Sequence, residues 1–237
     1  MKKKILLLAF IIASIGNMVA QKSSASDVLK EFGFTTDNVL SCIDLSNATY
    51  NFKATSETKT EQEANHTTSK SNKVYTYDAT KKQGEKFTLV SINGDTPRKK
   101  DFKHFDKEKN SVTDTETQKF KEEDFFIKSN DENTAIIGFN IPKEQLNSKT
   151  AFMAHCTGYI YIDKKSGHIT KIQISSNEAF NLKVFHVTQM NIDINLSYNE
   201  EHKQYYVSSE KTMMKVLILG SITDFNIEEN YSDFKFN

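Results

Sequence analysis

The residue types best suited to chemistry are two cysteines and six histidines, and their spacing matches no common catalytic site. His155 and Cys156 are adjacent, and a cysteine hydrolase uses these two residue types as base and nucleophile. Successive side chains of a strand point to opposite faces, so on a strand these two cannot act on each other. No histidine pair has the spacing of a metal site. We therefore expect no catalytic residue, no metal and no cofactor, and an unrecognised hydrolase is the weaker alternative.

The segment 182–198 contains the best candidate binding residues. Every second residue from Leu182 to Tyr198 is mostly apolar. The intervening residues, every second one from Gln189 onward, are polar. This period of two predicts a strand with one buried face and one wet face. A strand of this length is unusual, so a bulge or break is expected around 185–189. A ligand held on the apolar face is expected to contact Val184, His186, Met190, Ile192 and Ile194.

His186 is the one titratable group in this apolar register, between Val184 and Thr188. Two interpretations stay open for it. It is either a histidine at the edge of the core that bonds to a backbone carbonyl, or a ligand-contacting and pH-sensitive group.

Shorter runs rich in β-forming residues predict most of the remaining chain as strands: 48–58, 87–93, 134–141, 159–163, 169–174, 203–219 and 222–236. The connector 163–167, with Gly167 at its end, predicts a hairpin turn. Helices are expected at only three places, after Asp27, after Asp37 and from Thr96. The polar stretches 58–73 and 107–122 are expected to be exposed loops or strand ends. These expectations give about eight to eleven antiparallel strands.

The first twenty residues have the layout of a secretory signal peptide. Lys2, Lys3 and Lys4 precede an apolar run, 5–15, and a short polar stretch then leads to Ala20. The run is too short to cross the hydrocarbon core of a bilayer as a helix. We expect a signal peptide over 1–20, a single domain over 21–237, no stable membrane span, and a periplasmic or secreted protein after cleavage.

Charge and cysteine content narrow the range of partners. The chain has 31 basic and 31 acidic residues, and the leader contains three of the lysines. This balance argues against long-range attraction to nucleic acid or to an anionic membrane, and Arg98 is the only arginine. Cys42 and Cys156 form a disulfide in an oxidising compartment or remain two separate buried thiols, and the sequence leaves both possibilities open.

Two segments resemble known exported proteins. The strand and turn 87–97, which contains Asn93-Gly94 and Pro97 before a lysine-rich helix, is similar to a segment of exported bacterial proteins. The hairpin 158–172 resembles the central hairpin of the LolA-like group of periplasmic lipoprotein carriers and lipid-binding relatives. The resemblance implies a curved half-barrel covered by helices, with an apolar cavity between them. The carriers of this group use a cavity arginine, whereas Arg98 here belongs to a helix start, so no functional residue is carried over.

These observations combine into one expectation. The fold class is mainly β (α+β): a large curved antiparallel sheet, or half-barrel, covered by a few short helices. The expected function is that of an exported, non-enzymatic protein that binds a lipid, an acyl chain or another apolar small molecule between sheet and helices. The alternative is an envelope interaction or structural protein that docks a partner chain, such as an envelope protein, through its sheet.

Overall fold

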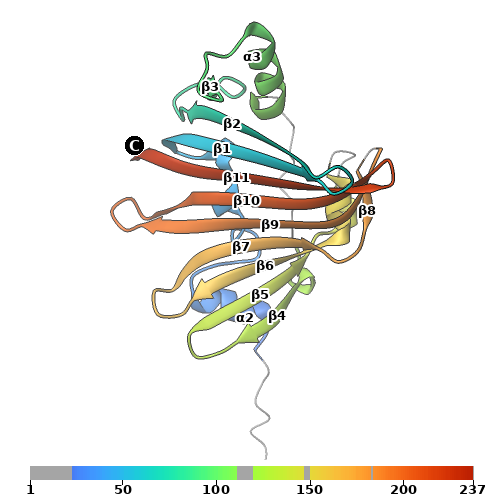
Figure 1. Cartoon of the computed structure of the whole chain (residues 1–237). Helices are drawn as coiled ribbons and strands as arrows, with labels where there is room; N and C mark the ends of the chain where they lie inside the picture. Colours follow the sequence, from blue (N-terminus) through green and yellow to red (C-terminus); the bar gives the residue numbers. More distant parts are fainter. Residues whose placement is uncertain (1–22, 111–119, 147–149, 183, 237) are drawn as a thin grey trace, which may run out of the picture.

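The computed structural model describes residues 23–110, 120–146, 150–182 and 184–236, and the expected signal peptide lies outside these ranges (Figure 1). A single large antiparallel sheet dominates the described chain, and only two short α-helices accompany it. The expected mainly β fold class is therefore confirmed. No helix among these residues is long and apolar enough to cross a membrane.

The sheet has eleven strands in the order β3-β2-β1-β11-β10-β9-β7-β6-β5-β4, and β8 pairs with β9 outside this path. The strands are β1 (Tyr50–Gln62), β2 (Thr67–Tyr77), β3 (Phe87–Ile92), β4 (Phe125–Asn130), β5 (Thr134–Asn140), β6 (Cys156–Asp163), β7 (His168–Ser176), β8 (Phe180–Leu182), β9 (Phe185–Asn199), β10 (Gln204–Ile218) and β11 (Ser221–Phe236). The first strand lies beside the last. The sheet is open, because β3 and β4 are its two edges.

The helical elements are short. They are α2 (Ala25–Glu31), η1 (Ser41–Ile43), η2 (Leu45–Asn47), α3 (Lys99–Phe105), the π-type turn η3 (Asp106–Asn110), η4 (Glu122–Asp124), η5 (Lys143–Gln145) and η6 (Ala151–His155). The N-cap of α2 is Ser24, three residues before the expected capping residue Asp27, and the two side chains form a reciprocal capping box. Figure 1 shows α2 behind β4–β7 and α3 beyond β2 and β3.

One face of the sheet, here called the inner face, carries two separate apolar clusters. The larger joins α2 to the sheet and includes Leu29, Phe52, Ile137 and Ile172. The smaller gathers side chains from β6 to β10, among them Phe180, Val187 and Val216. The opposite, outer face is mostly polar along β1, β9 and β11. Period-two alternation in long strands thus produces a sheet with one packed face and one wet face.

The structure decides between the two possibilities for 58–73 and corrects the expectation for the segment after Asp37. The stretch 58–73, expected as exposed loop or strand ends, consists of strand ends joined by a turn, because β1 continues to Gln62 and β2 begins at Thr67. Its threonines, serines and lysines pair across the β1–β2 hairpin and leave both faces polar, so composition alone did not distinguish a loop from strand ends. The segment after Asp37 forms turns and the short 3-10 turns η1 and η2 in place of a longer helix.

Candidate functional site

The middle of the inner face, across β9, β10 and β11, carries apolar side chains that are only partly buried. Thr212 of β10 pairs with Ile192 on one side and Ile227 on the other, and Met214 pairs with Phe225. All five side chains are partly exposed. We call Ile192, Thr212, Met214, Phe225 and Ile227 the open strip.

Packed regions bound the open strip at both ends of these strands. Toward the β10–β11 turn, Val187, Val216 and Thr223 are buried at 5% exposure or less, in the cluster that includes Phe180 of β8. Toward the other end, Leu196 and Val207 are buried in the larger cluster. Ile192, Met214 and Phe225 also pack against the smaller cluster, so the strip is a partly exposed stretch between two packed regions of the sheet.

A buried polar group closes one side of the strip. The hydroxyls of Tyr75 and Tyr231 each donate to Oε2 of Glu229 at 2.9 Å. Lys109 Nζ, from η3, lies 3.2 Å from Oε1 and 3.3 Å from Oε2 of the same carboxylate. Burial alone would raise the pKa of Glu229, but Lys109 and the two hydroxyls outweigh burial and hold the pKa below its ordinary value.

The pKa of Glu210, on the neighbouring strand β10, shifts in the opposite direction. It pairs with Glu229 across β10 and β11, and with Ile194 of β9. Burial, and then the neighbouring charge of Glu229, raise the pKa of Glu210 above its ordinary value. Two adjacent carboxylates therefore differ in proton affinity, because Lys109 forms its ion pair with Glu229.

Sequence reasoning missed this polar group, although a signal for it was present. Glu229 occupies the same alternating register as Ile227 and Tyr231, so its side chain lies on the same inner face of the sheet. The partner Lys109 belongs to the stretch 107–122, predicted as exposed loop or strand ends, and no sequence pattern links it to β11. The pairing depends on where η3 lies against the sheet.

The structure divides the five predicted binding residues into two groups. Met190, Ile192 and Ile194 lie on the inner face as expected, and Ile192 is part of the open strip. Val184 and His186 do not join them: both are exposed, and His186 Nδ1 lies 3.0 Å from Asn181 Oδ1. The pairing of β9 with β10 skips one residue at Thr188, and this bulge reverses the alternation. The expected break near 185–189 is confirmed, but its effect on the register was not foreseen.

The cysteine and histidine candidates form no catalytic pair in the described chain. His155 Nδ1 lies 2.7 Å from Glu178 Oε1, whereas the Cys156 thiol faces the Phe152 carbonyl at 3.9 Å. Cys42 and Cys156 are both free thiols. Burial raises the pKa of Cys42 to about 12 and that of Cys156 to about 11. Of the two possibilities left open by the sequence, the structure has the separate thiols.

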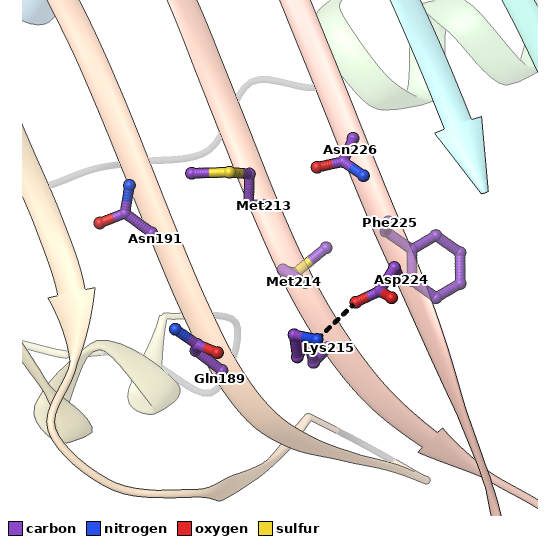
Figure 2. A pocket seen from close by; sticks show the side chains of 8 residues that line it. All are labelled: Gln189, Asn191, Met213, Met214, Lys215, Asp224, Phe225 and Asn226. Atoms are coloured by element: carbon purple, nitrogen blue, oxygen red, sulfur yellow. Dashed lines mark ion pairs between the residues drawn. The ribbon is translucent and has the colours of Figure 1, made fainter. Parts of the chain in front are cut away.

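A small hollow indents the outer face of β9, β10 and β11 (Figure 2). Its volume is about 150 Å³, and it is lined by Gln189, Asn191, Met213, Met214, Lys215, Asp224, Phe225 and Asn226. Lys215 Nζ lies 3.4 Å from Asp224 Oδ1 at its rim. Ligand sites usually measure about 300–1,000 Å³. None of the five predicted binding residues lines this hollow, although Met214 and Phe225 of the open strip do, and its volume is too small for a lipid.

No protein-family model matches the sequence, and no curated protein sequence matches it. Among solved structures, a LolA superfamily protein from Nitrosomonas europaea matches 91% of this chain and 94% of its own, at 9% identity and a TM-score of 0.35. A putative outer membrane lipoprotein-sorting protein domain from Vibrio parahaemolyticus matches 79% of this chain and 85% of its own, at 11% identity and a TM-score of 0.33. Both TM-scores are below 0.5 and both identities are below 25%.

Proposed function

We propose that this chain is an exported, non-enzymatic protein that holds an apolar ligand, a lipid or an acyl chain, against the inner face of its sheet. The observation that carries the proposal is the open strip. Isoleucine, methionine and phenylalanine side chains stay partly exposed there, between two clusters that are well packed. Partly exposed apolar area of this kind favours an apolar occupant, because covering it removes that area from water.

The shape of the strip suits a long, narrow ligand. Its five residues come from three adjacent strands, which lie about 4.8 Å apart, so the strip runs across the strands. The Glu229 group lies at its β2 side, since Tyr75 belongs to β2 and Tyr231 to β11. An acyl chain on the strip would therefore have polar side chains at one end and apolar ones along its length.

Export is part of the proposal and rests on the layout of residues 1–20. Intact-mass measurement of protein extracted from the cell envelope checks it, with cleavage expected near Gln21. Finding the complete leader on soluble cytoplasmic protein would contradict this part of the proposal.

Displacement of an apolar fluorescent probe tests ligand binding. We expect the protein to bind phenylnaphthylamine, oleic acid to compete for the same site, and Ile227→Asp to weaken both by about tenfold or more, because a carboxylate would face the acyl chain. The matched control is Val74→Asp. Val74 is also a partly exposed β-branched residue. It precedes Tyr75 in β2, so its side chain lies on the outer face of the sheet and that of Tyr75 on the inner face.

The thermal midpoint gives a second readout. Oleic acid at about 100 times its dissociation constant should add roughly 2.7 kcal/mol of stability to the native protein. Native mass spectrometry of the purified protein should then find a bound lipid. A protein that binds no probe and instead forms a stable complex with another chain through the strip would favour the docking alternative.

A further inference from the structure

The turn between β10 and β11 places a leucine where the backbone disfavours it. Ile218 pairs with Ser221, so Leu219 and Gly220 form a two-residue hairpin loop with φ values of +50° and +83°. Both values are positive, as in a type I′ turn, which favours Asn-Gly. The chain itself has that sequence elsewhere: Asn93 and Gly94 adopt φ values of +53° and +83°. A bulky leucine in this conformation is strained.

The strained leucine is also fully exposed. Leu219 has a relative exposure of 103%, so packing in the described structure does not explain its presence. The other non-glycine residues with positive φ in the described ranges are His66, Asn93, Lys203 and Asp233, all polar. An apolar side chain that gains nothing from folding at a strained position suggests a contact outside the protein.

A second apolar turn lies beside the first. His186 of β9 pairs with Leu217 of β10, so the β8–β9 and β10–β11 turns project from the same end of the sheet (Figure 1). Val184 is 88% exposed and Phe185 is 44% exposed. We call Val184, Phe185, Leu217 and Leu219 the apolar tip.

We propose that the apolar tip docks the protein onto the surface of a lipid bilayer by inserting these side chains among the lipids. The tip is a projection and not a groove. It can insert into a bilayer, because a bilayer surface needs no complementary shape to accept it. Exposed apolar patches with a polar rim mark interaction surfaces. Here the rim is the polar β1–β2 turn, since the Glu63 N–H donates to the Ile222 carbonyl at 3.1 Å.

The charge distribution at this end also favours a bilayer. Residues 184–188 and 216–222 contain no Asp, Glu, Lys or Arg. Lys183 precedes Val184 in the sequence, and on shallow insertion a lysine can keep its ammonium group at the headgroup level. The first charged pair along these strands is Lys215 and Asp224, further from the turn, where it would stay at the polar headgroup level. Attraction should therefore come from apolar burial and depend little on salt or on anionic lipid. This inference does not need a ligand on the open strip.

Local fluorescence tests the contact directly, because the chain has no tryptophan. In Leu219→Trp, phosphatidylcholine vesicles should shift the indole emission to the blue, and dibrominated phosphatidylcholine should quench it. The matched control is Val90→Trp, at an exposed valine of β3 on another part of the sheet. Its emission should not change. Because both variants keep residues 1–20, vesicle binding by the leader alone affects the two equally and leaves only the indole at the tip quenched.

A partition measurement supplies the second arm. Leu219→Asn creates the Asn-Gly sequence that this turn favours, so the fold should be kept or stabilised while the apolar side chain is lost. Together with Val184→Asn it should weaken vesicle partitioning by about tenfold or more, and Val90→Asn should have no effect. Equal quenching at positions 219 and 90 would overturn the proposal. So would vesicle binding that disappears at high salt, or a self-associated protein that becomes monomeric in Leu219→Asn without ever binding vesicles.

Discussion

The two halves of the inner face both carry isoleucine side chains, but the burial of these side chains differs between the halves. Over β5, β6 and β7, Ile137, Ile160 and Ile172 are completely buried beneath the cluster that includes α2. Over β9 and β11, Ile192 and Ile227 remain partly exposed. Strand alternation places all of these side chains on one face, but only tertiary cover decides whether they form a core or an accessible surface. The covered half forms the core, whereas the open strip leaves apolar side chains partly exposed.

The largest expected effect comes from truncating one isoleucine in each half. Ile172→Ala should lower the free energy of unfolding by about 2–4 kcal/mol, because it opens a cavity in a packed region. Ile227→Ala should cost about 1 kcal/mol or less, since water already reaches that side chain. Urea denaturation measures both. Equal losses would show that the two halves are packed alike.

The buried carboxylates at the boundary give the next effect. Glu229→Gln should destabilise the protein by about 2 kcal/mol, because Lys109 would lose its charged partner in a buried site. Glu210→Gln should be neutral or stabilise by up to about 1 kcal/mol at pH 7, because it removes a charge that burial and Glu229 disfavour. Thermal melting of the two variants compares them, and destabilisation by both would contradict the assignment of Lys109 to Glu229.

The two carboxylates also predict opposite pH dependences. The lowered pKa of Glu229 means that its stabilising contribution is present above the ordinary value of 4.5 and is lost as the pH falls through the folded-state pKa. The raised pKa of Glu210 means that its contribution is present below 4.5 and is lost as the pH rises through the folded-state pKa. The Glu210→Gln variant should therefore match the wild type below about pH 4.5 and gain on it at higher pH. A constant difference across the range would refute this.

The smallest expected effect concerns the thiols. Cys42 packs against the larger cluster and Cys156 belongs to the smaller one, and no disulfide links them. A reductant should leave the melting temperature unchanged, and both thiols should react slowly with iodoacetamide in the native protein, because their raised pKa values leave little thiolate. A melting temperature that falls in dithiothreitol would reveal a disulfide.

Sequence pattern predicted the fold better than the site, for a physical reason. Alternation identified the long strands and placed Met190, Ile192 and Ile194 correctly, since their environment repeats along the chain. It misplaced His186 because one extra residue at Thr188 shifts the register, and it misplaced Val184 because that residue lies in the β8–β9 turn before β9 begins. It also missed the contact of Lys109 with Glu229, which joins residues far apart in sequence. Cover and long-range pairing are properties of the whole fold.

Tryptophan fluorescence at the open strip tests the central claim most directly. The chain has no tryptophan, so Ile227→Trp introduces one reporter on the strip and Val74→Trp one on the outer face. The account predicts that a brominated fatty acid quenches the indole of Ile227→Trp in a saturable way, that unlabelled oleic acid reverses the quenching, and that Val74→Trp is unaffected. Quenching that is equal at the two positions, or absent from both while the proteins remain folded, would contradict a ligand on the inner face.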